Sequence, residues 1–366
     1  MASRLELWTN LSTAQTGNPL APVARAKRIE ADGWDGGTFV DTQCIANDAF
    51  MCLALCAGAT SRLRLSTGVT NPITRHPSVV AGAAATLQVL SGGRAVLGIG
   101  RGDSALAYIG ASPAPLDEFE RRLTVLQRYL GGESVPMDEA ASMLSGARQG
   151  YENLALAQTL PGSWLKWLPE GYAKVPMEVL ATGPRVIAIG ARRAEIVSVA
   201  VGADERRLAW AIGVAREAAE RAGRDPATIR FGALVPLHAH DDIRQARRHA
   251  LGAVSGTARF SIMNKRIVGP VTAHQREVLE RLAQVYDMKT HGQGGAQAAV
   301  LDDAFIDDFA VVGRPERCLE RLAAIVALGY DRLWLTTPLD QGASGEESYR
   351  MTVAEVIPAL RAVRQA

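Results

Sequence analysis

Residues 62–104 read RLRLSTGVTNPITRHPSVVAGAAATLQVLSGGRAVLGIGRGDS, and this stretch decides the fold. Polar and apolar side chains alternate over 62–70, which is typical of a strand. The Ala- and Val-rich segment 77–90 begins with proline and ends before Gly92-Gly93, as expected of a helix. Residues 94–99 form a short apolar run that suits a buried strand. The stretch therefore predicts one strand–helix–strand unit of a parallel sheet.

The same alternation continues along the chain, with helices predicted between successive strands. The predicted strands are residues 5–9, 36–40, 62–70, 94–99, 177–180, 196–201, 229–237 and 332–336. Repeated βα units predict the α/β class and, within it, a (β/α)₈ TIM barrel. An open doubly wound sheet is the alternative.

Two segments interrupt this pattern and are interpreted as insertions after strands. They cover residues 131–175 and 256–304 of a single predicted domain that spans 1–366. The first carries Trp164 and Trp167 among polar residues, which suggests a segment that folds over a pocket; a plain surface loop is the alternative. The second is predicted to be irregular or helical.

Composition narrows the class of protein. The chain has 366 residues, of which 48% are hydrophobic, and a formal net charge of +2. Near-neutral charge without a basic cluster argues against nucleic acid as a partner. No apolar run approaches the ~20 residues of a membrane span, and the N-terminus lacks a signal-peptide pattern, so we expect a cytoplasmic protein. The cysteines have no metal-ligand spacing, and no metal site is predicted. They are Cys44, Cys52, Cys56 and Cys318.

Chemistry is expected where parallel strands end, because ligands bind at the carboxyl ends of the strands in α/β folds. In the loop 98–103, three glycines allow a ligand to approach the backbone closely. Arg101 offers a guanidinium for phosphate, and Asp103 offers a carboxylate that could move a proton. A salt bridge between these two residues is the alternative. A dinucleotide fingerprint would require glycine at position 103, so that interpretation is weak.

A second anion site is suggested at Ala181-Thr182-Gly183-Pro184, where a strand end meets a helix that begins with proline. An ordinary tight βα turn explains this segment equally well. His76 precedes Pro77 and is interpreted first as a helix-start residue and second as a catalytic base. His238 and His240 lie at a strand end without acidic or Cys neighbours at metal spacing.

Three segments resemble the luciferase-like monooxygenase superfamily. The first is TGVTNPITRHPSVVAGAAATLQVLSGGRAVLGIGRGDSAL, residues 67–106. The others are residues 181–226, which begin ATGPRVIAIG, and 305–322, FIDDFAVVGRPERCLERL. Within the superfamily the chain is most similar to the methylenetetrahydromethanopterin reductase branch, which uses coenzyme F420, a deazaflavin.

The resemblance implies a barrel with insertions, a homodimer, and a flavin or deazaflavin held at the carboxyl ends of the strands. It implies a cis peptide between Gly68 and Val69, a phosphate contact at Arg101 and a proton donor at Asp103. The candidate cofactor-binding residues are Asp41, Thr67, Gly68, Val69, Arg101, Gly102, Ser104, Thr182, Gly183, Pro184 and Gly190. The candidate substrate residues are Trp8, Asn10, Asn71 and His76.

The chain also departs from the family pattern. Many members have a catalytic histidine just after the second strand, where this chain reads Val40-Asp41-Thr42. We therefore expect hydride transfer between coenzyme F420 and a small organic substrate. An FMN-dependent monooxygenase that uses O₂ is the first alternative, and a non-catalytic cofactor-binding member of the family is the second.

Overall fold

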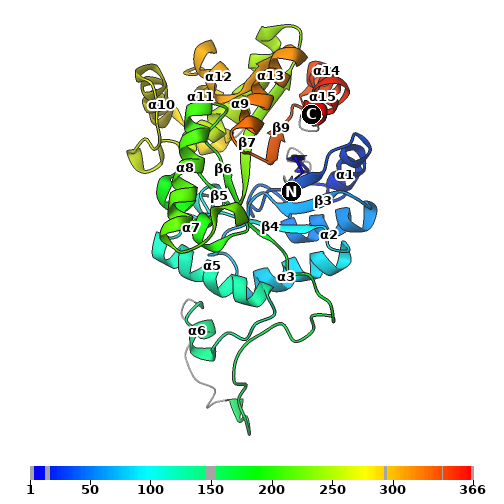
Figure 1. Ribbon diagram of the computed structural model, residues 1–366, viewed down its shortest axis with the longest axis vertical. Coiled ribbons are helices and arrows are strands. Elements are labelled where there is room, and N and C mark those ends of the chain that lie inside the picture. Colours follow the sequence, from blue (N-terminus) through cyan, green and yellow to red (C-terminus); the bar gives the residue numbers. More distant parts are fainter. Residues whose placement is uncertain (1–3, 13–16, 145–153, 292–294, 340, 364–366) are drawn as a thin grey trace. The chain divides into compact units, whose positions relative to one another are not determined.

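The computed structural model describes residues 4–12, 17–144, 154–291, 295–339 and 341–363 (Figure 1). The chain groups into two compact units. The first unit comprises residues 1–14, 28–37 and 179–366, and the second comprises residues 15–27 and 38–178. Each unit is described by itself.

The second unit contains β3 and β4, the end of β2 and the beginning of β5, with helices between them. Its strands are parallel, since Leu65 pairs with Ala95 and the N–H of Gly68 donates to the carbonyl of Phe39 at 2.7 Å. One or more helices follow each of the strands β2, β3 and β4 along the chain. The elements are β2 (Gly36–Phe39), α2 (Ala49–Ala59), β3 (Arg64–Thr67), α3 (Pro77–Leu90), β4 (Ala95–Ile99), α4 (Ser104–Ala107), α5 (Leu116–Leu130), α6 (Met137–Ala141) and β5 (Met177–Ala181).

One arginine joins the helices of this unit at their carboxyl ends. The guanidinium of Arg94 donates to the carbonyls of Ala57 and Thr60, which end α2, and to the carbonyl of Ser91, which follows α3. Helix ends leave carbonyl groups unpaired and carry partial negative charge, so a cation there is favourable. This contact fixes both helices relative to the start of β4.

The first unit holds the remaining strands. In parallel register, β1 pairs with β9, β9 with β7, and β7 with β6. The short strand β8 pairs in parallel with the last residues of β7. The elements are β1 (Glu6–Asn10), α7 (Pro184–Arg193), β6 (Ile196–Val199), α8 (Glu205–Arg221), β7 (Arg230–Ala239), α9 (Ile243–Phe260), α10 (Ala273–Val285), α11 (Gly295–Ala298), α12 (Asp303–Phe309), β8 (Val311–Gly313), α13 (Pro315–Ala327), β9 (Arg332–Thr336), α14 (Gly342–Met351) and α15 (Ile357–Val363); α1 (Ala21–Ala31) is shared between the units.

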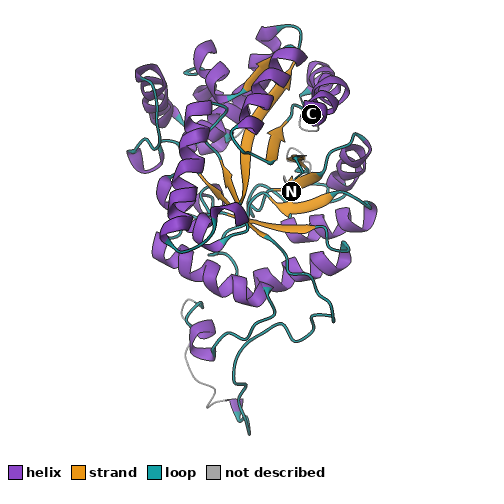
Figure 2. Cartoon of the chain, viewed as in Figure 1, coloured by secondary structure: helices purple, strands orange, loops and turns teal. Residues whose placement is uncertain are grey.

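The strands follow the order β6-β5-β4-β3-β2-β1-β9-β7-β8, and β6 also pairs with β7. In this order β6 is the first strand and β7 the eighth, and their pairing closes the parallel sheet. The predicted (β/α)₈ barrel is therefore confirmed, and the open sheet is excluded. All eight predicted strands are present, and Figure 2 shows helices alternating with them. The extra strand β8 was not predicted, because three residues are too few for a periodic pattern.

The first insertion lies after α5 and before β5, and not directly after a strand as predicted. The reason is that α5 already completes the fourth βα unit. The described part of this segment is fixed to the helices of its own unit: Gln88 of α3 donates to the carbonyl of Ala173 at 3.0 Å. Val135 and Ser163 form an antiparallel bridge through two hydrogen bonds of 2.8 Å. Figure 1 shows the segment outside α3 and α5, on the side away from β3 and β4.

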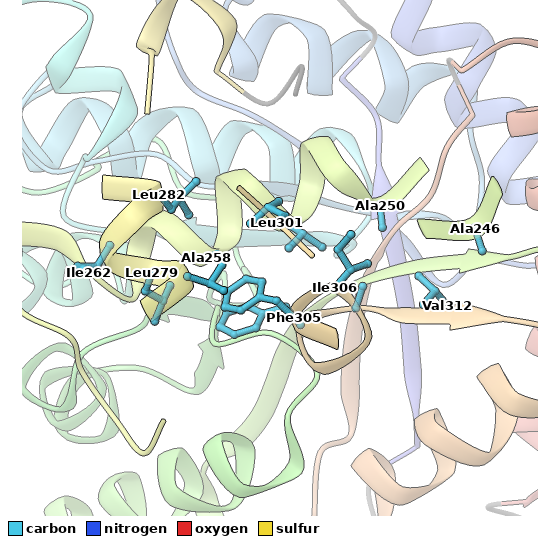
Figure 3. Close-up of a cluster of buried hydrophobic side chains, with 14 residues drawn as sticks. Ala246, Ala250, Ala258, Ile262, Leu279, Leu282, Leu301, Phe305, Ile306 and Val312 are labelled. Carbon is cyan, nitrogen blue, oxygen red and sulfur yellow. The ribbon is translucent and has the colours of Figure 1, made fainter. Parts of the chain in front are cut away.

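The second insertion is mainly helical and has a hydrophobic core of its own. Apolar side chains of α9, α10, α12 and β8 meet in one buried cluster, in which Phe305 and Phe309 stack with ring centroids 4.3 Å apart. Figure 3 shows Ala258 and Leu279 next to Phe305, with Ile262 beyond Leu279. The cluster explains why α9 extends to Phe260, into the segment from residue 256 that was predicted as an insertion. Burial of a helix face outweighs the weak helix propensity of individual residues.

The structure also bears on membrane insertion. In the described ranges, no helix combines the length and apolar character that a bilayer crossing requires.

Candidate functional site

The carboxyl end of β2 presents a buried carboxylate. Asp41 follows Phe39 by two residues, and its side chain is 1% exposed. One oxygen accepts hydrogen bonds from the hydroxyl of Thr70 at 2.6 Å and from Arg75 at 2.5 Å, and the other accepts from Gln43 at 2.9 Å. Asp41 is therefore held as the acceptor of three donors.

Arg75 has a second carboxylate partner. Its other terminal nitrogen donates to Asp48 at 2.8 Å, and Asp48 also caps the N-terminus of α2 through the N–H of Met51. Burial lowers the pKa of Arg75, but the hydrogen bonds and charges of Asp41 and Asp48 outweigh this effect and raise it overall. The sequence analysis missed Arg75, because only the fold brings residues 41, 48 and 75 together.

The carboxyl end of β3 lies against β4. The peptide between Gly68 and Val69 is cis, as the resemblance implies. The hydroxyl of Thr67 donates to the carbonyl of Gly98 at 2.6 Å, and the N–H of Thr70 donates to the same carbonyl at 3.0 Å. A Cβ atom at Gly98 would lie 2.1 Å from the carbonyl oxygen of Thr67, so this position requires glycine.

The turn after β3 contains two buried polar atoms without a hydrogen-bond partner among the described residues. Asn71 accepts hydrogen bonds from the N–H groups of Ile73 and Thr74 through Oδ1, both at 3.0 Å, which leaves its Nδ2 group buried and unpaired. The hydroxyl oxygen of Thr74 is also buried and unpaired. Buried donors are almost always satisfied, so this turn is suited to a ligand with acceptor atoms.

The loop after β4 carries Arg101, Gly102, Asp103 and Ser104 between β4 and α4. Arg101 donates through Nε to the carbonyl of Ala114 at 2.6 Å and accepts from the N–H of Ala114 at 3.0 Å. These two bonds fix the loop. Gly102 has a positive φ of 83°, and a Cβ there would lie 2.8 Å from Asn71 Cβ. Asp103 begins α4 without capping it through its side chain. Thus Gly102 places this loop directly beside Asn71.

His76 serves as a helix cap. Its Nδ1 accepts from the N–H of Ser78 at 3.1 Å, so Nε2 carries the proton and donates to the carbonyl of Ala140 at 2.9 Å. Both ring nitrogens are therefore used inside the second unit. This geometry supports the helix-start interpretation of His76 over that of a catalytic base.

In the first unit, Thr182, Gly183 and Pro184 occupy the predicted strand-to-helix turn. Gly183 is the N-cap residue of α7, Pro184 begins the helix, and the hydroxyl of Thr182 donates to the carbonyl of Ala200 at 3.2 Å. Gly190, in contrast, lies in the middle of α7, where a Cβ would come within 3.2 Å of Val179 and 3.3 Å of Val197. Close helix–sheet packing accounts for glycine at that position.

Trp8 and Asn10 have partners within the first unit. Trp8 is fully buried, donates to Glu6 at 3.0 Å, and lies under the guanidinium of Arg332, 3.5 Å from the ring centroid. Asn10 accepts from the indole N–H of Trp334 at 2.7 Å. Packing therefore explains Trp8, whereas Asn10 ends β1 as a partly exposed polar residue.

A histidine cluster joins β7, α9 and the start of α14. His240 accepts from the N–H of Asp242 through Nδ1, so its Nε2–H faces Ser344 at 3.3 Å. Ser344 lies 2.9 Å from His249 Nε2, and His249 Nδ1 lies 2.7 Å from the amide oxygen of Gln341. His238 is fully buried beside His249, and burial lowers its pKa to about 3. In the described part of the chain, no group of three or more His, Cys, Asp or Glu side chains is arranged to hold a metal ion.

Comparison with known proteins identifies the family. Residues 6–332 match the family described as luciferase-like monooxygenase. The chain belongs to this family. A relative is the 5,10-methylenetetrahydromethanopterin reductase of Methanolobus tindarius, 23% identical over 347 residues, which cover 93% of this chain and 97% of the relative.

Two solved structures of the luciferase-like family share the fold. The coenzyme F420-dependent tetrahydromethanopterin reductase of Methanopyrus kandleri is 21% identical, with a TM-score of 0.70 over 98% of this chain and 100% of that one. The oxygenating constituent of 3,6-diketocamphane monooxygenase from Pseudomonas putida, in complex with FMN, is 17% identical, with a TM-score of 0.63 over 98% of both chains. These luciferase-like relatives are oxidoreductases.

Proposed function

We propose that this luciferase-like protein transfers a hydride between coenzyme F420 and a small organic substrate. The observation that carries the proposal is the set of polar groups at the carboxyl ends of β2, β3 and β4 in the second unit. They are Asp41, Asn71, Thr74, Arg101 and Asp103. The F420-dependent reductase among its structural neighbours supports the choice of cofactor.

The residues present fit a deazaflavin ring. The unpaired Nδ2 group of Asn71 is a donor, and the pyrimidine edge of a deazaflavin presents carbonyl acceptors. Gly102, which packs against Asn71 Cβ, keeps the neighbouring loop free of a side chain that would crowd this edge. FMN has the same pyrimidine edge, so this fit supports a flavin or a deazaflavin equally. The choice between FMN and F420 depends on the contacts to the phosphate and to the tail.

The two carboxylates have different assigned roles. Asp41 already accepts from Thr70, Arg75 and Gln43, so we assign it to acceptor contacts and not to proton donation. When bound, the deazaflavin supplies the hydride donor or acceptor. Reduction of a carbonyl also requires a proton at the oxygen, and we assign this proton transfer to Asp103.

The FMN-dependent monooxygenase remains the second candidate, favoured by the FMN-bound neighbour. Thr42 stands where many luciferase-like proteins carry a catalytic histidine, and this departure supports the reductase. A non-catalytic role is less well supported, because the polar residues of the β4 loop are all present.

The two cofactors can be distinguished by titrating the full chain with F420 and with FMN, each oxidised and reduced, under fluorescence detection. We expect micromolar or tighter F420 binding that weakens as salt rises, since exposed ion pairs to the polyanionic tail are screened. Asp103→Asn should leave that dissociation constant within about threefold, because a proton donor adds little to binding. Micromolar FMN binding without measurable F420 binding would overturn the proposal in favour of the monooxygenase.

A further inference from the structure

Three elements of the first unit bring a serine, a glutamine and two histidines together. Ser344 lies in the first turn of α14 and Gln341 is the N-cap residue of that helix, while His249 lies on α9 and His240 follows β7. Ser344 is partly exposed, whereas the exposed fraction of His249 is only 6%. A small molecule can therefore reach the serine hydroxyl, and the imidazole behind it is shielded from water. The function proposed above uses none of these four residues.

The position of the proton on His249 follows from its contacts with Gln341. The side-chain nitrogen of Gln341 donates to the backbone carbonyl of His249 at 3.1 Å, so its amide oxygen is the atom 2.7 Å from His249 Nδ1. An amide oxygen can only accept, so Nδ1 carries the proton and Nε2 of the neutral ring is an acceptor. The hydroxyl of Ser344, 2.9 Å from Nε2, therefore donates its hydrogen bond to His249.

A second histidine contacts the same hydroxyl oxygen. His240 Nδ1 accepts from the backbone N–H of Asp242 at 3.0 Å, so its Nε2 carries the proton. This nitrogen lies 3.3 Å from Ser344 Oγ and 3.7 Å from the carboxylate of Glu347. Because His240 is a donor to the serine oxygen, the only acceptor for the serine hydrogen in this cluster is His249. The contacts thus give the hydrogen-bond chain a single direction.

We propose that Ser344, His249 and Gln341 form a nucleophilic triad that hydrolyses small carboxylic esters. A hydroxyl donates to an imidazole, and the other ring N–H is held by a third acceptor, which is the order of contacts in serine and cysteine hydrolase triads. Such triads occur on unrelated folds and are recognised by geometry and roles. The amide oxygen of Gln341 fixes the tautomer and the orientation of the ring.

The reaction needs only an ester and water. Ser344 Oγ forms a bond to the ester carbonyl carbon while His249 Nε2 takes the hydroxyl proton. The bond from this carbon to the alcohol oxygen then breaks, and His249 gives the proton to the leaving alcohol. Water next attacks the acyl carbon and transfers a proton to His249. The bond to Ser344 breaks, the serine oxygen regains the proton, and a carboxylic acid leaves.

The surroundings favour the charges that develop during this reaction. The first N–H groups of a helix have no partner within the helix, and Gln341 does not cap α14 through its side chain. We assign these N–H groups and the Nε2–H of His240 to the oxyanion. His238 stacks beside His249 with ring centroids 6.5 Å apart, and burial lowers the pKa of His238 to about 3. His238 therefore stays neutral and does not repel an imidazolium at His249.

The test is labelling of the full chain with diisopropyl fluorophosphate, followed by peptide mapping, together with hydrolysis of p-nitrophenyl acetate. We expect an adduct on Ser344, and loss of both the adduct and the hydrolysis in Ser344→Ala. His249→Gln should slow both reactions roughly a hundredfold or more, the usual contribution of a general base. Gln341→Ala should lower kcat roughly tenfold or more with little change in KM, because the imidazole loses its orienting partner.

Matched variants separate this role from general reactivity and from misfolding. Ser255→Ala changes a serine of α9 whose hydroxyl bonds a carbonyl of its own helix, and His274→Gln changes an exposed histidine of α10. Both should react like wild type. Ser344→Cys keeps a nucleophile beside the base, and iodoacetamide should alkylate it faster than the exposed Cys44 of the same molecule. Circular dichroism should show that every variant is folded.

Several results would overturn the proposal. They are the absence of an adduct at Ser344 in wild type, equally fast labelling in His249→Gln, hydrolysis that Ser344→Ala leaves intact, and alkylation of Ser344→Cys no faster than that of Cys44. An unchanged kcat in Gln341→Ala would also contradict the triad, because the orienting group would then have no effect on the base.

Discussion

Arg75 donates to Asp41 at 2.5 Å across the ends of two strand-to-helix connections, and the Asp41 side chain is 1% exposed. The pair joins the loop after β2 to the loop after β3. Asp41→Asn removes a buried charge that partners the half-buried guanidinium of Arg75, so we expect a loss of about 2–3 kcal/mol of unfolding free energy in urea titrations. Asp48→Asn is the control, because asparagine is as good an N-cap as aspartate and the Asp48 side chain is 42% exposed. Equal losses in the two variants would contradict the importance of the buried pair.

Arg101 is expected to contact the cofactor phosphate. Loss of a charge-assisted hydrogen bond costs about 1.5–3 kcal/mol, so Arg101→Ala should weaken F420 binding roughly ten- to a hundredfold. The variant also loses the bond to Ala114, so thermal unfolding should be measured alongside fluorescence titration. Arg121→Ala removes an exposed arginine of α5 that bonds Ser142, and it should bind normally. Unchanged dissociation constants for both F420 and FMN in Arg101→Ala would disprove the phosphate assignment.

The polyanionic oligoglutamate tail of F420 has four candidate cationic partners, and the fold separates them. They are Arg185, Arg192, Arg193 and Lys265. Arg185 is in the first turn of α7, and Lys265 lies three residues before Val268, whose Cγ1 would be 4.0 Å from a Cβ at Gly183. Arg192 and Arg193 end the same helix, about 14 Å away from its start. Arg185→Ala combined with Lys265→Ala should weaken F420 binding at low salt and leave FMN binding unchanged, whereas Arg193→Ala should change neither. A loss of F420 affinity only in Arg193→Ala would contradict this placement of the tail.

His238 makes stability depend on pH. Burial lowers its pKa to about 3 in the folded state, below the ordinary value of 6.5. The unfolded chain therefore binds the proton first, and stability contributed by neutral His238 is lost as the pH falls from 6.5 toward 3. Between pH 7 and pH 4.5 this effect amounts to about 2–3 kcal/mol. His238→Leu should flatten the urea-denaturation profile over that range. Parallel profiles for wild type and His238→Leu would exclude this role.

Gly98 tests close packing at the carboxyl end of β4, and Gly58 of α2 is its control. Gly98→Ala places a Cβ 2.1 Å from the carbonyl oxygen of Thr67, and a rigid backbone atom cannot move away cheaply. We expect a loss of several kcal/mol in unfolding free energy, or failure to fold. Gly58→Ala in α2 meets nothing within 4 Å and should stabilise the chain by about 0.5–1 kcal/mol. A stable Gly98→Ala variant with unchanged cofactor affinity would contradict the packing argument.

Periodicity predicted the barrel because every strand but one is long enough to show its pattern. The eight predicted strands are all present, and β8, with three residues, was missed. The helices of the second insertion were not located, since their stability comes from a shared cluster around Phe305 and not from local signals.

The candidate site was predicted less completely. Loops such as 100–104 are recognisable by glycine and charge, but Arg75 has no local signal: its partners lie 34 and 27 residues away. The two unpaired atoms of Asn71 and Thr74 likewise depend on burial, which the sequence does not reveal. Gly190, a candidate cofactor residue taken from a family segment, also has a packing role that the sequence does not reveal, because a Cβ there would meet Val179.

The bridge between Val135 and Ser163 has a consequence for how this protein could change over evolution. Two residues that exchange both backbone hydrogen bonds hold their Cα atoms about 5.5 Å apart, a gap that a two-residue hairpin turn closes. The chain between them can therefore be shortened, lengthened or replaced without altering the path from α5 to β5. This loop and the strand-end loops that hold the candidate site are then free to diversify separately.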